Sequence, residues 1–494
     1  MPSARKKEEV PLWFELAANL SLKLHLENSY SAFERVIQCG GLLSAMPPAM
    51  ASKHFDPQTQ EIWLQCEGFN DKNHYPRKTP CDDDTLRKAV KDVPAADWMN
   101  WFNGWAQEVF QRHGFFDPKG IFLGDGSYLF VPDNPAYEGS VVMWFDEHNH
   151  PVDYGKLTTE ERKKAHRERC YKLVSLIHLR ADCYVYAAVA LVPGNAHECP
   201  VLYELVEKFV RSVGKGVIQL LILDRGFIDG KNVTRCKQHW GIDVLIPIKT
   251  NMDIWKDAWA LGRTEPWESF PVSAPKAKAP ENQDRPEVVK RREAKRQRTL
   301  AQRRPAPDPA EVLTHREYCL IRGFNSWSDC QVPIDVILMR ERYADGHVQE
   351  WALMTTKRYT DVQQPRTDYQ YRVKIEERHR MLKCFHDLSD FHSRSLNTIA
   401  AQVVFVLLSY TLRQWQLWKL HHEELSGVSP ELMRRRLNIR KQYVVIYLAN
   451  AYARIPLIRF TREVLELEPE ARAKALAKIR KLEQSLLSPL DDTS

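Results

Sequence analysis

The chain has 494 residues, of which 44% are hydrophobic, and a formal net charge of +7 at pH 7. This length allows roughly two to four domains with sizeable cores. Ten cysteines without a CxxC pair exclude a regular disulfide framework and a zinc finger of ordinary spacing.

The basic excess is concentrated between residues 271 and 304, which hold eleven Lys or Arg and four Asp or Glu. This excess of seven equals the net charge of the whole chain, so the remaining residues are balanced. A local cluster of this kind suits a polyanionic partner such as DNA. A solvated, flexible charged segment is the other interpretation.

The N-terminal region, residues 1–117, is predicted to be mainly helical. Apolar side chains recur at intervals of three and four over residues 12–39 and 85–113. No clear helix-turn-helix pattern is present, so two roles stay open for this region. It either binds DNA ends or packs against the rest of the chain.

A different pattern begins near Gly120, where short apolar segments alternate with helical ones. The predicted elements are strands at 120–131, 170–179 and 183–193, a helix at 200–213, a strand at 217–224, a helix at 230–240 and a strand at 243–249. Three strands, a helix, a strand, a helix and a strand predict a mixed sheet covered by helices, the order expected of a ribonuclease H-like core. We assign its first part to residues 118–250.

An insertion is predicted over residues 251–360. Residues 271–310 carry seven prolines beside the basic cluster and are expected to form a poorly ordered excursion. Strands are predicted at 318–322, 334–340 and 350–356, after which helices at 368–390 and 395–421 complete the core over residues 361–422.

The C-terminal region, residues 423–494, is predicted to be helical. Its apolar stripe, formed by Leu476, Ile479, Leu482 and Leu486, suits either dimerisation or packing on its own domain. The most apolar run of the chain, residues 399–418, is interrupted by polar side chains and predicts a buried helix rather than a membrane span.

Three carboxylates stand out as candidate catalytic groups. Asp125 and Asp224 lie in or at the end of apolar strands, where an ionised carboxylate is costly unless it is paired or binds a metal. Both are followed closely by glycine, which permits a sharp turn and leaves room beside the carboxylate. Taken alone, an aspartate followed closely by glycine at a strand end is most often only a turn.

Glu376 lies in the third candidate segment, YQYRVKIEERHRMLK. Arg372 and Glu376 are four residues apart and share a helical face, as do Tyr369, Glu376 and Lys383 at intervals of seven. One stripe of this helix therefore presents an aromatic ring, two cations and a carboxylate, which suits metal and phosphate. An exposed, salt-bridged helix face is the alternative.

The spacing Tyr-x2-Arg-x3-Glu-x6-Lys resembles the YREK signature of bacterial insertion-sequence transposases, the DDE group that cuts and pastes DNA. The flanking sequences FLGDGSYL, LLILDRGF, WALMTT and ALVPGNAHE are also similar to that family, and the resemblance covers about residues 118–420. The interval of 152 residues between Asp224 and Glu376 resembles the family's inserted β domain.

The resemblance implies an α/β fold in which a ribonuclease H-like catalytic core is interrupted by a β-rich insertion, with helical N- and C-terminal regions. It implies that Asp125, Asp224 and Glu376 hold Mg²⁺, with Mn²⁺ as a substitute, for two-metal cleavage and joining of double-stranded DNA. Tyr369, Arg372 and Lys383 would then contact DNA phosphates, and Trp327 would stack on a displaced base.

The same resemblance implies a homodimer on paired transposon ends and, in the absence of a secretory signal, a cytoplasmic location with the nucleoid. Two other functions stay open on the sequence. One is a nuclease with the same core but no joining activity, and the other is an inactive DNA-binding regulator.

Overall fold

The structure is a computed structural model that describes residues 12–23, 46, 50, 83–272, 312–419, 421, 423–428, 443–448, 451–456, 464 and 467–477. The expected excursion at residues 271–310 lies almost entirely outside the described residues, so its character stays a prediction.

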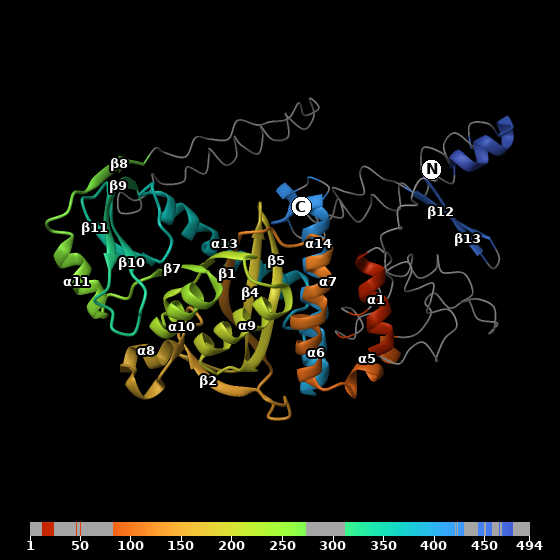
Figure 1. The fold of residues 1–494 in the computed structure, drawn as a ribbon. Coiled ribbons are helices and arrows are strands. Elements are labelled where there is room, and N and C mark those ends of the chain that lie inside the picture. The colour runs from red at the N-terminus through yellow and green to blue at the C-terminus, as the bar shows by residue number, and fades with distance from the viewer. Residues whose placement is uncertain are drawn as a thin grey trace, which may run out of the picture.

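A mixed sheet of eleven strands runs through the described fold, with helices packed around it (Figure 1). Its core consists of β1 (Gly120–Val131), β4 (His166–Arg180), β5 (Cys183–Pro193), β6 (Ile218–Ile222) and β7 (Asp243–Pro247). The spatial order is β5-β4-β1-β6-β7, in which β4 is antiparallel to β1 and β5, whereas β6 and β7 run parallel to β1. The ribonuclease H-like core predicted from the sequence is thereby confirmed.

The alternation of side chains along β1 explains the sequence Gly124-Asp125-Gly126. A Cβ atom at Gly124 would lie 2.4 Å from Leu202, on the helix α9 (Glu198–Val213), so α9 covers that face of the strand. Asp125 points to the opposite face, as period-2 alternation requires. Gly126 lies inside the strand, so the prediction of a sharp turn at this glycine is wrong, whereas the prediction of room for a close neighbour is right.

The inserted β region continues the core sheet. It comprises β8 (Glu268–Pro271), β9 (Leu313–Phe324), β10 (Ile334–Tyr343) and β11 (Val348–Thr355), which pair antiparallel in that order. Strand β11 also pairs with β7, so hydrogen bonds join the insertion to the strand beside β6. The predicted β-rich insertion is confirmed.

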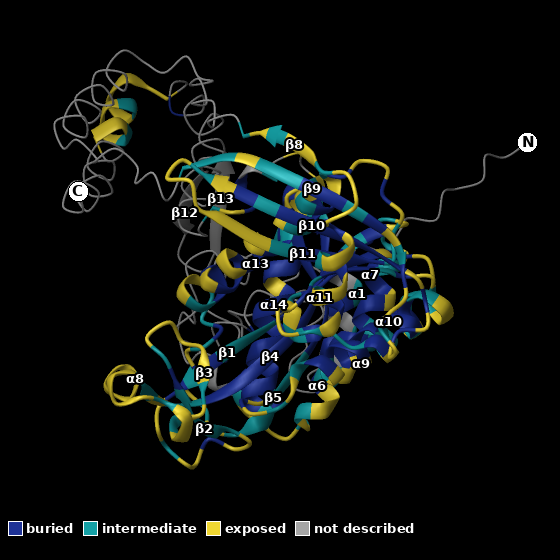
Figure 2. Cartoon of the chain, turned by 90° about the vertical axis from the view of Figure 1, so that its left-hand side faces the viewer, coloured by how far each residue is buried: buried dark blue, intermediate teal, exposed yellow. Residues whose placement is uncertain are grey.

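The sequence did not predict several shorter elements. These are β2 (Val141–Phe145), β3 (Pro151–Val152) and α8 (Thr159–Lys164) between β1 and β4, and α11 (Asp253–Leu261) before β8. Their residues are mostly half-buried or exposed (Figure 2), and β3, α8 and α11 lack the continuous apolar runs that marked the core strands. Strand β2, with the sequence VVMWF, is such a run and was missed.

The N-terminal helices pack on the core that contains β1 and β4. They are α1 (Leu12–Lys23), α5 (Asp83–Lys91), and a longer helix formed by α6 (Ala95–Trp101), the π-helical η1 (Phe102–Ala106) and α7 (Gln107–Arg112). The ring of Trp98 lies 5.3 Å from that of Phe405 on α14 (Leu396–Lys419), and both belong to the same apolar core as β1 and β4. This supports the packing role predicted for the region.

Helix α14 is the one described helix that is long and apolar enough to cross a membrane, but 72% of its most apolar window is buried inside the fold. The buried core helix predicted for this segment is confirmed.

Farther along the chain, β12 (Tyr443–Leu448) and β13 (Ala451–Pro456) form an antiparallel hairpin. A helical C-terminal region is therefore wrong for this stretch and right for residues 469–477. Of its proposed apolar stripe, Leu476 is 38% exposed, and Ile479, Leu482 and Leu486 lie outside the described residues.

One buried amide secures the free edge of β5, which pairs only with β4 among the described strands. The Asn103 side chain donates to Val189 O and accepts from Val189 N, both at 2.8 Å. Replacing Asn103 by Ala leaves two buried backbone groups without partners, so we expect Asn103→Ala to lower the free energy of unfolding by about 2–4 kcal/mol in denaturant titrations. The control is the half-buried Asn134, whose side chain accepts from the exposed Ala136 N, with an expected loss below about 1 kcal/mol on replacement by Ala. Equal losses in the two variants would contradict this role.

Candidate active site

Two adjacent parallel strands carry the first two candidate carboxylates to the same level of the sheet. Leu123 of β1 is paired with Ile222 of β6. Asp125 lies two residues after Leu123, and Asp224 lies two residues after Ile222. Asp125 is 5% exposed. Asp224 comes directly after the strand and caps the 3-10 turn η3 (Arg225–Phe227), where its carboxylate accepts from Arg225 N at 2.7 Å.

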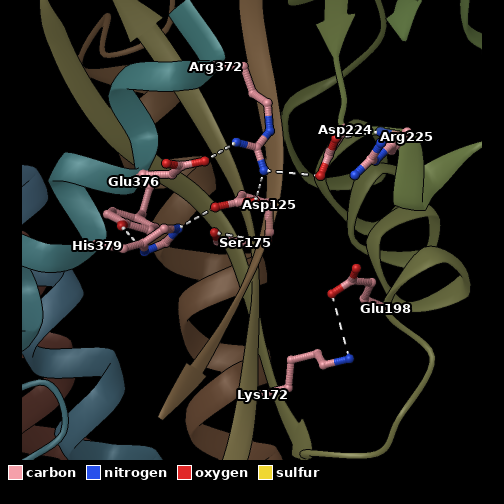
Figure 3. Close-up of polar contacts among 10 residues, drawn as sticks. Asp125, Lys172, Ser175, Glu198, Asp224, Arg225, Arg372, Glu376 and His379 are labelled. Carbon is pink, nitrogen blue, oxygen red and sulfur yellow. Dashed lines mark hydrogen bonds and ion pairs between the residues drawn. The ribbon is translucent and has the colours of Figure 1, made fainter. Parts of the chain in front are cut away.

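The helix α13 (Gln364–Phe385) brings Arg372 and Glu376 over this level of the sheet. Nη2 of Arg372 lies 2.6 Å from Asp125 Oδ1 and 3.5 Å from Asp224 Oδ2. Its Nη1 lies 3.3 Å from Glu376 Oε1. One buried guanidinium therefore contacts all three candidate carboxylates, which come from three separate elements (Figure 3).

The three carboxylates contact the guanidinium of Arg372, which occupies the space among them. Within the described ranges, no group of three or more His, Cys, Asp or Glu side chains is placed so that it could hold a metal ion. The oxygen donors of Asp125, Asp224 and Glu376 nevertheless suit hard divalent cations, and they already share one positive charge. The three carboxylates thus fit a divalent ion, which would require the guanidinium of Arg372 to move out from among them.

The electrostatics of the site depend on burial and on paired charges. Burial by itself raises the pKa of Asp125, but the contact with His379 and the charge of Arg372 outweigh burial and hold this pKa below its ordinary value. Burial by itself lowers the pKa of Arg372, and the carboxylates of Asp125 and Asp224 more than offset this effect. Asp125 is therefore ionised and Arg372 is charged at neutral pH.

A cavity of about 340 Å³ opens beside these groups. Its lining residues are Asp125, Gly126, Ser127, Arg372, Glu376, His379, Arg380 and Lys383. Lys383 has no hydrogen bond or ion pair with any described residue, so its ammonium is available to a ligand. Burial lowers its pKa, while the charge of Asp125 acts in the opposite direction.

Two of the other predicted site residues lie outside the lining of this cavity. Tyr369 is half-buried with its ring 6.3 Å from that of Trp351, and burial raises its pKa to about 12. Trp327 lies in the connection between β9 and β10, half-buried against the core. The cavity lining thus includes Asp125, Arg372, Glu376 and Lys383 but not Asp224, Tyr369 or Trp327. Asp224 contacts Arg372, and the charge of Asp224 also acts on the pKa of Tyr369.

The sequence did not single out His379, whose Nε2 lies 3.1 Å from Asp125 Oδ2. His379 follows Glu376 by three residues, so its helical spacing was a usable signal.

Glu198, at the start of α9, is a fourth carboxylate near the site. Its Oε2 lies 3.7 Å from Lys172 Nζ. Cβ atoms built at Gly126 and Gly226 would come within 2.2 and 3.1 Å of its carboxylate oxygens, so both glycines make room for it.

Comparison with known proteins adds a family. The sequence matches the family described as "Transposase DDE domain" over residues 138–412. That span is more than half of the chain and contains Asp224 and Glu376, whereas Asp125 lies before it. No curated protein matches the sequence.

Among solved structures, the chain is similar to the piggyBac transposase synaptic complex with hairpin DNA, determined by cryo-EM. The two share 12% sequence identity with a TM-score of 0.34 over 86% of this chain and 80% of that chain. A similarity at this level supports no further conclusion.

Removing the shared cation tests the electrostatic account. Arg372→Met leaves Asp125 buried beside uncompensated carboxylates, so we expect the free energy of unfolding at pH 7 to fall by about 3–5 kcal/mol. In wild type, the pKa of Asp125 is lower in the folded state than in the unfolded chain, where it is about 3.9. Ionised Asp125 therefore stabilises the fold fully above the unfolded pKa, and this stabilisation is lost as the pH falls through the folded pKa. In the variant, the unpaired carboxyl takes up a proton more readily. The difference in free energy of unfolding between wild type and Arg372→Met, measured in denaturant titrations, should therefore become smaller as the pH falls from 7 towards 4.

The control for this measurement is Arg342→Met, which removes a half-exposed cation paired with Glu317 at 2.7 Å. We expect a loss of about 0–1 kcal/mol there. A difference between wild type and Arg372→Met that stays constant with pH would contradict the charge compensation.

Proposed function

The chain belongs to the transposase DDE domain family, and we propose that it is a DNA transposase that cleaves the ends of a mobile element and joins the freed 3′ hydroxyl to target DNA. The observation that carries this proposal is the contact of one buried guanidinium with Asp125, Asp224 and Glu376. Three carboxylates separated by 99 and 152 residues in the chain meet at one place in the fold, as metal-dependent phosphoryl transfer requires.

Asp125, Asp224 and Glu376 would hold Mg²⁺, for which Mn²⁺ substitutes. When bound, two such ions supply activation of the attacking oxygen and stabilisation of the leaving 3′ oxygen. The role of the chain itself is to position these oxygen donors and the DNA. Asp125 is fixed by the buried strand β1, and Glu376, whose side chain is 74% exposed, approaches from α13 on the solvent side.

Double-stranded DNA is the proposed partner. Lys383 and Arg372 offer cationic donors to phosphate oxygens beside the carboxylates, and the basic cluster between residues 271 and 304 supplies a longer-range attraction. Tyr369 and Trp327 are proposed as further DNA contacts. We also propose a homodimer in the complex with paired ends and a cytoplasmic, nucleoid-associated location.

The triad is tested on labelled DNA that carries an end of the element flanking the gene, in the presence of Mg²⁺. We expect wild type to release a 3′ hydroxyl at the element boundary, and Asp125→Ala, Asp224→Ala and Glu376→Ala to give no cleavage above background. End binding, measured by mobility shift, should be retained in all three variants because the DNA contacts lie on other side chains.

The matched control is Glu377→Ala, which removes the neighbouring carboxylate on the same helix. Glu377 is half-exposed, is paired with Arg380 and does not line the cavity, so its variant should cleave like wild type. Mg²⁺-dependent cleavage by any triad variant would sink the assignment. Cleavage without joining to a target duplex would identify a nuclease, and end binding without cleavage by wild type would identify a DNA-binding regulator.

Lys383 is proposed to neutralise one phosphate, which gives a separate prediction on binding. We expect Lys383→Ala to weaken DNA binding similarly across sequences and to reduce the slope of log affinity against log salt concentration by about 0.9. Lys374→Ala is the control, since Lys374 lies on the same helix but pairs with Asp182 at 3.0 Å, outside the cavity. An unchanged salt slope for Lys383→Ala would remove this lysine from the DNA contacts.

A further inference from the structure

His379 contacts the first aspartate on the side that Arg372 leaves open. It lies one helical turn after Glu376 on α13, is 4% exposed and lines the cavity. Its Nε2 is 3.1 Å from Asp125 Oδ2, whereas Arg372 Nη2 is 2.6 Å from Oδ1. The two oxygens of one buried carboxylate thus contact two different side chains of the same helix (Figure 3).

The other nitrogen of the ring is also occupied. The hydroxyl of Tyr186, a buried residue of β5, lies 3.4 Å from His379 Nδ1. If Tyr186 donates to Nδ1, the neutral ring carries its proton on Nε2, which faces Asp125. The Nε2–H direction is not aligned with Oδ2 as a hydrogen bond, since Nε2 has no hydrogen-bond partner among the described atoms. A small rotation of the ring or of the carboxylate would align this 3.1 Å contact.

We propose that His379 is a positioning residue that holds Oδ2 of Asp125, so that Oδ1 is presented to the divalent ion. This inference rests on the proposed function of the site. Arg372 cannot serve as the lasting holder of Asp125, because the same guanidinium also contacts Asp224 and Glu376 and occupies the space among them. His379 is 3.1 Å from Asp125 and forms no ion pair with Asp224 or Glu376 in the described part of the chain, so it can stay in place when the cation among the carboxylates is exchanged.

The physical reason for such a residue is the freedom of a carboxylate to rotate about its side-chain bonds. Fixing one oxygen removes this freedom before the ion arrives, so less ordering is required on binding. Partners that orient metal-binding carboxylates in this way typically contribute about 10–100-fold in metal affinity.

The chain contains the same combination of side chains at a place where no metal is proposed. Asp117 contacts His178 Nε2 at 3.5 Å and Arg180 Nη2 at 2.9 Å, and the His178 side chain is fully buried. This second Asp-His-Arg group lies just before β1 and on β4, and none of its residues lines the cavity. A substitution at His178 therefore perturbs a buried histidine without touching the triad.

The test measures binding of Mn²⁺ to the purified full chain by counting free ions with electron paramagnetic resonance. Thermal melting and Mg²⁺-dependent DNA cleavage are recorded on the same samples. We expect His379→Phe to weaken Mn²⁺ binding by about 10–100-fold, and His379→Gln, which keeps an N–H donor near the position of Nε2, to recover much of the loss. His178→Gln should bind Mn²⁺ like wild type even if its melting temperature falls.

If His379→Phe and His379→Gln fold and bind Mn²⁺ as tightly as wild type, and wild type cleaves DNA, the positioning role of His379 is overturned. The proposed function would then still stand. A loss of affinity in His178→Gln as large as in His379→Phe would also overturn the positioning role, because the effect would then follow from general destabilisation. Failure of the wild-type chain itself to bind Mn²⁺ and to cleave DNA would instead overturn the proposed function, and this inference with it.

Discussion

The arrangement of the site depends on the buried guanidinium of Arg372. Asp125 is nearly inaccessible to solvent, and a buried carboxylate without a positive partner is strongly destabilising. Arg372 supplies that partner and at the same time contacts Asp224 and Glu376, so one side chain ties β1, the turn after β6 and α13 together. The guanidinium therefore offsets part of the repulsion among the acidic groups that the fold brings together.

The two faces of β1 have different roles: one packs against α9, and the other presents Asp125 to α13 and the cavity. On one face, Gly124 and Gly126 have no side chains, which lets Leu202 and Glu198 of α9 approach the sheet closely. On the other face, Asp125 meets side chains of α13 and borders the cavity. Packing density on the first face holds the strand in place, and a strand so fixed can present a carboxylate without reorganisation. A side chain at Gly124 would collide with the buried Leu202 and Leu223, whereas one at Gly126 would displace the end of the Glu198 side chain.

The sequence was sufficient for features whose signals are local. Continuous apolar runs marked β1, β5 and β6, and spacings of four and seven placed Arg372, Glu376 and Lys383 on one side of α13. Contacts set by tertiary packing were not accessible in this way. The pairing of His379 with Asp125 joins residues far apart in the chain, and Tyr369 shares the stripe with Glu376 but packs towards Trp351. The hairpin of β12 and β13 was missed although YVVIYL is rich in β-branched and aromatic residues, which favour strands.

Charge balance bears on the divalent cations proposed for a site that already holds a guanidinium. Three carboxylates contact the single guanidinium of Arg372, and with Lys383 on the same cavity the formal charge of this group is −1. A bound divalent ion would make this formal charge positive, which suits a phosphodiester. Lys383 stands unpaired among the described residues on the same cavity, where its charge adds to the attraction for phosphate. The formal charge of the proposed site would therefore change sign when an ion binds, and this change favours binding of the proposed DNA phosphate after the ion.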